Sequence, residues 1–171
     1  MGVLGRMLRG VRAGDAHLAW ARLEGPQTLV VSSTDFDDGG QLARQHAGEG
    51  VGANISPALE WTGVPVDAAA LLLVVEDRDV PLPRPIIHVI ATMHPVIESL
   101  ARGQLAHSSA GVDLLAGSLG GIGYAGPRPI VDHGPHHYVF QLFALDREVG
   151  SIDEAVGHVL ARGRITGTYE R

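Results

Sequence analysis

Cysteine is absent from this 171-residue sequence. Disulfide bonds, thiolate catalysis and zinc sites built on thiolates are therefore all excluded, and a reducing compartment is permitted. No apolar run approaches the roughly 20 residues that a membrane-spanning helix needs. Internal repeats, low-complexity segments and interdomain linkers are also missing. At this length a single domain over residues 1–171, stable without a covalent or metal staple, is the expectation.

Basic residues are in deficit, because 13 Lys and Arg stand against 19 Asp and Glu, for a formal net charge of -6. We therefore expect no nucleic-acid partner. The basic cluster Arg6, Arg9 and Arg12 encloses no apolar core of about seven residues, as a secretory signal would require. A cytoplasmic location is thus expected. Such a short basic segment allows weak contact with an anionic membrane surface and is otherwise a frayed terminus.

Turn-forming residues are plentiful, with 23 glycines and 10 prolines, which favours short elements joined by tight turns. Three apolar runs bounded by Pro, Gly or Asp predict strands over Ala70–Val75, Pro85–Met93 and Tyr138–Leu145. Nearly every position in them is apolar, so we expect strands covered on both faces. A weaker strand is predicted over Thr28–Ser32.

The C-terminal part has a helical signature. Ser151 and Glu154 have the spacing of a capping box, in which hydroxyl and carboxylate satisfy the first amides of a helix. Apolar residues then recur at helical spacing, at positions 152, 155, 156, 159 and 160. The pattern predicts a short amphipathic helix over 151–163. Residues 1–27 are expected to form an N-terminal extension and the first edge elements.

Polar side chains flank the three predicted strands. Asp77 and Asp79 follow the first, His88 lies inside the second, and His136 and Tyr138 begin the third. Residues two apart on a strand share a face, which places His136 beside Tyr138 and His88 beside positions 90 and 92. Two imidazoles, a phenol and two carboxylates from three segments predict a polar pocket. Taken singly, Asp-x-Asp more commonly caps its own loop, and a lone strand His is more commonly a satisfied core residue.

Glycine and proline stiffen the segments around these side chains. We expect them to frame the pocket through Pro81, Gly126, Pro127 and Gly134. The sequence has nine histidines, whose ordinary titration near pH ~6.5 makes the net charge sensitive to mild acid. Five of them are expected to be surface loop residues: His17, His46, His94, His107 and His133.

Several motifs together closely resemble the phosphatidylethanolamine-binding protein family, also called Raf kinase inhibitor protein-like. The motifs are Asn54–Trp61, Asp77–Pro81 followed by His88, Gly123–Pro127, and Gly134–Tyr138. Their order and spacing agree with the family from about Thr28 to the end of the chain. The segments Ala155–Ala161 and Gly167–Tyr169 look like the bacterial branch.

This resemblance implies a mainly β protein, an antiparallel β-sandwich with a few peripheral helices and a small anion-binding cavity. Asp77 and Asp79 match the two acids of the family's Asp-Pro-Asp-x-Pro motif, and His88 matches the His that follows it. His136 and Tyr138 match the His and Tyr of its Gly-x-His-Arg-Tyr motif. Pockets of this kind accept phosphate, sulfate or acetate-like groups and the phosphoethanolamine head group.

The sequence departs from the family pattern at five positions, which affect ligand choice more than fold: Arg78 for Pro, Val89 for Trp, Arg128 and Ile130 within the Pro-Pro segment, and His137 for Arg. Arg78 adds a fixed positive charge that favours an anion or neutralises the neighbouring acids. Val89 removes an aromatic wall from beside the cavity.

The main functional hypothesis is a non-enzymatic binding protein, without cofactor or metal, for a small phosphorylated or carboxylated ligand. The family name carries with it modulation of a partner protein, and the bacterial branch implies a homodimer. Acidic residues can hold and charge neighbouring histidines, so anion affinity is expected to rise as pH falls from about 7.5 to 5.5.

A metal-dependent hydrolase or lyase is one alternative. It would bind a divalent ion through His88, His136 and either Asp77 or Asp79, since two imidazoles and a carboxylate form a plausible facial set. The spacing of these residues follows no His-x-His or His-Glu-x-x-His pattern, and the family resemblance accounts for them without a metal.

A serine esterase is the other alternative. Ser118 would be the nucleophile, with Asp132 and either His133 or His136 downstream in the usual chain order. The elbow motif lacks its first glycine, and the acid and base follow the serine too closely for a hydrolase triad. The glycine-rich run over 117–126 is more simply interpreted as a turn that frames the pocket.

Overall fold

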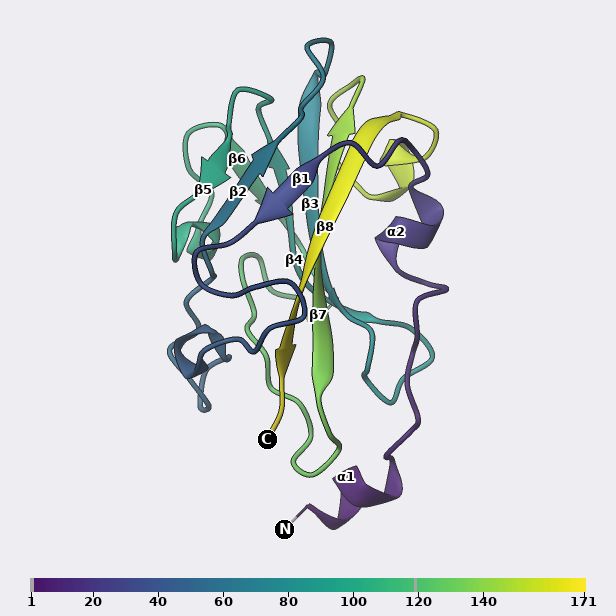
Figure 1. Cartoon of the computed structure of the whole chain (residues 1–171), viewed down its shortest axis with the longest axis vertical. Helices are drawn as coiled ribbons and strands as arrows, with labels where there is room; N and C mark the ends of the chain where they lie inside the picture. The colour runs from purple at the N-terminus through teal and green to yellow at the C-terminus, as the bar shows by residue number, and fades with distance from the viewer. Residues whose placement is uncertain (1, 119) are drawn as a thin grey trace.

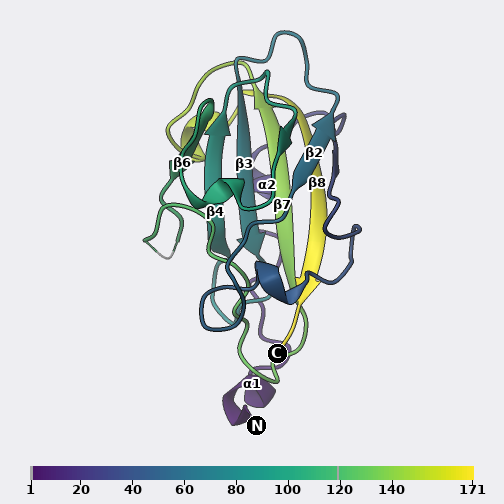
Figure 2. The ribbon, with the colours of Figure 1, turned by 90° about the vertical axis from the view of Figure 1, so that its left-hand side faces the viewer.

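Two antiparallel sheets form the protein, a computed structural model of which describes residues 2–118 and 120–171. The smaller sheet has the order β1-β2-β5, with β1 Val30–Ser32, β2 Leu59–Thr62 and β5 Ser99–Leu100. The larger sheet has the order β6-β4-β3-β7-β8 (Figures 1 and 2). Its strands are β3 Ala70–Asp77, β4 Ile86–Met93, β6 Val112–Leu115, β7 His136–Leu145 and β8 Val159–Tyr169. The strands predicted within β1, β3, β4 and β7 are confirmed.

Helices are few and short. They are α1 Val3–Met7, α2 Ala19–Arg22, and the 3-10 turns η1 Arg44–His46, η2 Gln104–Ala106 and η3 Asp153–Ala155. None of these described helices has the length and apolar character needed to cross a bilayer. The architecture is therefore mainly β with peripheral helical turns, as expected.

The larger sheet is covered on both faces, as its apolar strands predict. Toward the smaller sheet, Leu73 of β3 and Phe140 of β7 pack in one core with Trp61 of β2. On the opposite face, Leu72 and Phe143 pack beneath α2 and η3. Every residue of β3 is buried. Each buried leucine or phenylalanine side chain stabilises the fold by about 1.5–3 kcal/mol relative to an exposed one. The fully buried β3, in the middle of the larger sheet, is therefore the centre of the fold.

The predicted helix over 151–163 is wrong. The capping box forms, with the Glu154 amide donating to Ser151 Oγ at 3.3 Å, but only the three-residue turn η3 follows. Gly157 then adopts φ 81°, and β8 pairs with β7 along its whole length. Alternate residues of β8 face inward, and at Gly163 an added Cβ would lie 2.3 Å from the Leu29 carbonyl oxygen. Strand pairing and this close backbone approach outweigh the local helical signal.

Antiparallel pairing brings the polar residues to one end of the larger sheet. Asp77, at the end of β3, pairs with Tyr138 near the start of β7 and with Ile86 at the start of β4. The β3–β4 register skips His88, which is the extra residue of a β-bulge. Bulges re-aim side chains. His88 consequently packs against the Tyr138 ring, whereas Ile90 lies on the opposite face beneath α2, so the expectation that His88 and Ile90 share a face is wrong.

The N-terminal extension is anchored to the larger sheet. Glu76 of β3 accepts hydrogen bonds from the Ala19 amide of α2 and from Gln141 Nε2, both at 2.7 Å. The Gln141 side-chain oxygen in turn accepts from the Trp20 amide at 2.7 Å. Burial raises the pKa of Glu76, although these hydrogen bonds oppose the rise. A buried polar cluster therefore fixes where the chain enters the sandwich.

Candidate ligand-binding site

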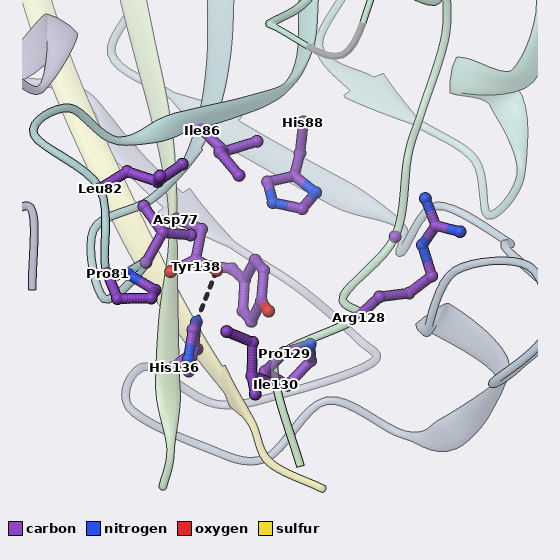
Figure 3. A pocket seen from close by; sticks show the side chains of 12 residues that line it. Asp77, Pro81, Leu82, Ile86, His88, Arg128, Pro129, Ile130, His136 and Tyr138 are labelled. Atoms are coloured by element: carbon purple, nitrogen blue, oxygen red, sulfur yellow. Dashed lines mark hydrogen bonds and ion pairs between the residues drawn. The ribbon is translucent and has the colours of Figure 1, made fainter. Parts of the chain in front are cut away.

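A cavity of about 480 Å³ opens where β3 ends and β4 and β7 begin. Most of its wall is apolar and a few polar groups converge on it, which is the usual composition of a small-molecule site. Figure 3 shows the side chains that line it: Asp77, Val80, Pro81, Leu82, Ile86, His88, Gly126, Arg128, Pro129, Ile130, His136 and Tyr138.

The structure brings most of the residues singled out from the sequence to this cavity. Asp77, His88, His136 and Tyr138 line it, together with the frame residues Pro81 and Gly126. Three other predicted residues do not line it: Asp79, Pro127 and Gly134. Gly134 lies in the turn before β7, with a φ of 106° that favours glycine.

His88 and Tyr138 form the polar part of the wall. Both are buried, and their rings lie nearly perpendicular with centroids 5.1 Å apart (Figure 3). His88 Nδ1 is hydrogen-bonded to the Ala125 carbonyl oxygen, which only accepts, so this nitrogen carries the proton. His88 Nε2 and the Tyr138 hydroxyl are buried without a partner among the described residues. An unpartnered buried polar group costs about 1–3 kcal/mol, so a ligand that bonds either atom would recover this cost.

Burial fixes the protonation of this pair. It lowers the pKa of His88, although the Ala125 hydrogen bond and the Asp77 charge act in the opposite direction. It raises the pKa of Tyr138, with a further contribution from Asp77. At neutral pH the wall therefore presents a lone pair on His88 Nε2 and a hydroxyl on Tyr138 that can donate or accept.

The side chains of Asp77 and His136 are hydrogen-bonded to each other. Asp77 Oδ2 lies 2.7 Å from His136 Nδ1 (Figure 3), and Asp77 Oδ1 accepts from the Asp79 amide at 2.8 Å. His136 Nε2 lies 2.8 Å from Nδ1 of His133. Since both nitrogens of His136 are engaged by protein groups, this residue offers a ligand the surface of its ring.

Asp79 faces Arg12 of the N-terminal extension instead of the cavity. It accepts from the Arg12 guanidinium and from both the amide (2.6 Å) and the imidazole (2.7 Å) of His137. Burial alone would raise the pKa of Asp79, but these hydrogen bonds outweigh it and lower the pKa. Arg78 also points elsewhere and pairs with Asp15 at 2.9 Å. The charges of Asp79 and Arg78 therefore hold Arg12 and Asp15 of the N-terminal extension.

Two histidines expected on the surface are buried. His133 is 1% exposed and His46 is fully buried, with its Nδ1 2.8 Å from the Ile55 carbonyl oxygen. His17, His94 and His107 are exposed as expected. The expectation is wrong for His46 and His133 because their loops fold back on segments remote in sequence, which a local pattern does not reveal.

Residues outside the predicted site complete the cavity, among them Arg128 and Ile130, which the sequence analysis had named only as departures from the family pattern. Val80 and Leu82 belong to the proline-rich connection between β3 and β4, Ile86 begins β4, and Pro129 and Ile130 belong to the loop before β7. Arg128 is exposed on this loop. One signal in the sequence could have identified these apolar residues. They lie in or directly beside two loops that adjoin the predicted site residues.

The geometry gives little support to the two enzyme alternatives. No group of three or more His, Asp or Glu side chains among the described residues is arranged to hold a metal ion. The Ser118 hydroxyl accepts a hydrogen bond from the Ile87 amide at 2.9 Å. Asp132 bonds the Gly2 amide and pairs with Arg6, and His133 bonds His136. The three members of the supposed triad are therefore engaged with partners other than one another.

Comparison with known proteins gives a consistent answer. A UPF0098 protein of Chlamydia muridarum is 32% identical over 84% of this chain and 99% of its own length, and one of Methanothermobacter thermautotrophicus is 35% identical over 80% of this chain and 95% of its own. The crystal structure of CT736, a phosphatidylethanolamine-binding protein homologue of Chlamydia trachomatis, superposes with a TM-score of 0.73 at 31% identity, covering 85% of this chain and 99% of that one. Escherichia coli YbcL superposes with a TM-score of 0.77 at 25% identity, covering 84% and 99%. The model of the phosphatidylethanolamine-binding protein family matches residues 32–170, and the chain belongs to this family.

Proposed function

We propose that this protein binds a small anion, such as a phosphorylated head group or a carboxylate, without converting it chemically. The observation that carries the proposal is the pair of buried, unpartnered polar atoms, His88 Nε2 and Tyr138 Oη, on the wall of one 480 Å³ cavity. Buried polar groups in proteins are nearly always paired, so two unpartnered atoms on side chains that line one cavity are best explained by a ligand that satisfies both.

The charge balance of the wall is compatible with an anion. Asp77 would repel a phosphate, but its carboxylate is bonded to His136 and to the Asp79 amide. Arg128 contributes a fixed positive charge from the exposed end of the wall. An anion that enters from the Arg128 side therefore meets a cation before it reaches the carboxylate.

The ligand would share a proton with His88. Because Nε2 of the neutral ring only accepts, the best partner is an acid oxygen that still carries hydrogen, such as a singly protonated phosphate ester, whose second pKa is about 6. The alternative is that His88 takes up a proton on binding a fully ionised anion. Both routes make binding tighter in mild acid.

The apolar wall suits the organic part of a ligand. Leu82, half exposed, lies with Ile86 and Ile130 on the lining, close to the polar pair. A phosphoethanolamine-type ligand would place its phosphate at His88 and Tyr138 and its alkyl portion on these side chains. The Asp77 carboxylate is then the natural partner for an ammonium group.

Calorimetric titration of chelator-treated protein with O-phosphoethanolamine, inorganic phosphate and acetate at pH 6 tests the proposal. Saturable binding that Tyr138→Phe weakens about tenfold is the expected result. His94→Gln, a change at an exposed histidine remote from the cavity, is the matched control and should bind normally. Absence of binding to all three anions would overturn the proposal, and binding restored by added zinc or manganese would favour the metal alternative instead.

A further inference from the structure

A continuous chain of hydrogen bonds leads from the cavity wall to the N-terminal segment, here residues 2–14. It runs from Asp77 Oδ2 to His136 Nδ1 at 2.7 Å, and from His136 Nε2 to His133 Nδ1 at 2.8 Å. It ends at 2.9 Å between His133 Nε2 and the carbonyl oxygen of Leu8. His133 and His136 are each 1% exposed, so water does not compete for these contacts.

Counting protons shows what this chain requires. Each of its three hydrogen bonds needs one proton, and the Leu8 carbonyl can supply none. Two neutral imidazoles supply one each, and an ionised carboxylate supplies none. The complete chain therefore holds one proton more than Asp77, His136 and His133 carry in their ordinary states at neutral pH, wherever along the chain that proton resides.

We propose that His133 is a positioning residue of the cavity, which shares this extra proton with His136 and Asp77, and that the shared proton latches the N-terminal segment to the site. With the proton present, the three side chains are together neutral and every contact is made. Without it, two nitrogen lone pairs face each other at 2.8 Å or the contact with Leu8 opens. The proton also decides whether an anion meets a neutral or a negative wall, and this consequence rests on the proposed function.

The N-terminal segment lies directly on the loop that carries His133. Figure 1 shows α1 below the start of β7, at the same end of the molecule as the C-terminus. Its backbone packs so closely that a Cβ added at Gly5 would lie 2.0 Å from the Val131 carbonyl oxygen. Arg9 donates to the Asp132 carbonyl at 2.8 Å. A segment held this closely keeps the Leu8 carbonyl within reach of His133.

Other ionisable groups surround the chain, and most of them keep a fixed charge through the histidine range. Hydrogen bonding lowers the pKa of Asp79 and of Asp132, despite partial burial of both, and burial lowers that of His88. The remaining groups that face this region are Tyr138, His137 and the arginines Arg6, Arg9, Arg12, Arg78 and Arg128. Of these, His137 alone is a histidine, and it needs its own control.

Asp77→Asn is the sharpest test because it supplies the missing proton permanently. The amide nitrogen would stand where Oδ2 stands and donate to His136 Nδ1, while the amide oxygen would keep the bond from the Asp79 amide. Both imidazoles then complete the chain in their neutral forms. The measurement is hydrogen exchange of the amides of residues 2–14, corrected for its intrinsic pH dependence. In the parent protein, the protection factors should fall about tenfold between pH 6 and 8.5. Asp77→Asn should keep this protection throughout.

Two further variants and two controls separate the latch from ordinary stability. His133→Leu and Gly5→Ala should lower the protection of residues 2–14 at every pH and abolish its pH dependence, the first by removing the latch and the second by steric displacement from Val131. His17→Gln and His137→Gln should retain the pH transition of the parent. If protection of the parent does not change with pH, or Asp77→Asn loses protection as the parent does, the shared proton is refuted.

Sulfate titrations distinguish this inference from the proposed function, because sulfate keeps one charge state over this pH range. Sulfate affinity of the parent should fall about tenfold from pH 6 to 8.5, and that of Asp77→Asn should change less. If the exchange results hold but no anion binds, the latch stands and the proposed function fails. A flat sulfate affinity in the parent would contradict the effect of the latch on the cavity.

Discussion

Asn54 holds the cavity-lining Gly126 from a segment 72 residues away in sequence. Its side-chain oxygen accepts from the Gly126 amide at 2.7 Å, and its side-chain nitrogen donates to the Tyr124 carbonyl at 3.0 Å. Asn54 adopts φ 55°, a left-handed conformation that asparagine tolerates. The side-chain amide of Asn54 therefore bonds the residues on both sides of Ala125, whose carbonyl orients His88.

Gly126→Ala should loosen this wall. Its Cβ would lie 2.2 Å from the His46 carbonyl oxygen, so the backbone must move, which we expect to cost about 1–3 kcal/mol. Urea denaturation and anion titration would show lower stability and weaker binding. Gly121→Ala is the matched control, because no atom of the described residues lies within 4 Å of its added Cβ, and it should change neither.

Two tyrosine changes should have opposite effects. The Tyr138 hydroxyl has no partner among the described residues, so Tyr138→Phe is expected to leave stability unchanged or slightly raised while anion affinity falls about tenfold. The Tyr124 hydroxyl donates to the His46 carbonyl at 3.0 Å, so Tyr124→Phe should cost about 1 kcal/mol of stability with affinity nearly unchanged. Thermal unfolding and calorimetry on the pair would decide, and equal destabilisation by both changes would contradict the assignment.

Anion affinity should rise as pH falls from about 7.5 to 5.5. Burial lowers the pKa of His88, so the free protein holds this ring neutral, and binding an anion favours its protonation. Proton uptake, measured by calorimetry in buffers of different ionisation enthalpy, should accompany binding of sulfate. Binding of singly protonated phosphate should take up less, because the ligand brings its own proton. Affinity independent of pH for both ligands would exclude this role of His88.

Glu76→Gln should change the pH dependence of stability. Burial raises the pKa of Glu76, so the folded chain binds its proton more tightly than the unfolded chain. The contribution of Glu76 is full below the pKa of the unfolded chain, ~4.3, and is lost as pH rises through the higher pKa of the folded chain, at up to about 1.4 kcal/mol per pH unit. Denaturation of both proteins should be measured from pH 4 to 8. The free energy of unfolding of Glu76→Gln should rise relative to that of the parent as pH rises. Parallel curves would contradict it.

The strands that carry the site were readable from sequence because they are buried on both faces and bounded by turn residues. β3, β4 and β7 therefore coincide with apolar runs. β8 was missed because apolar residues at 155, 156, 159 and 160 fit a helix, whereas the alternation that marks the strand begins only after them. Pairing with β7 decides between helix and strand here, and local periodicity carries no information about a pairing partner.

Within the site, residues on strands were easier to predict than residues on loops. The strand period placed His136 and Tyr138 together, and both line the cavity. The bulge that re-aims His88 and the contacts that bury His133 come from segments far away in sequence, so no local pattern encodes them. Asp79 illustrates the same point, since its partner Arg12 lies in the N-terminal extension.

Pairing of β3 with β7 has a kinetic consequence. Asp77 and His136 are 59 residues apart in sequence, and the central ladder joins residues that are still more remote. Long-range antiparallel pairing requires large loops to close before contacts repay the lost entropy, which slows folding. We therefore expect the cavity to assemble late in folding, after local hydrophobic contacts have formed.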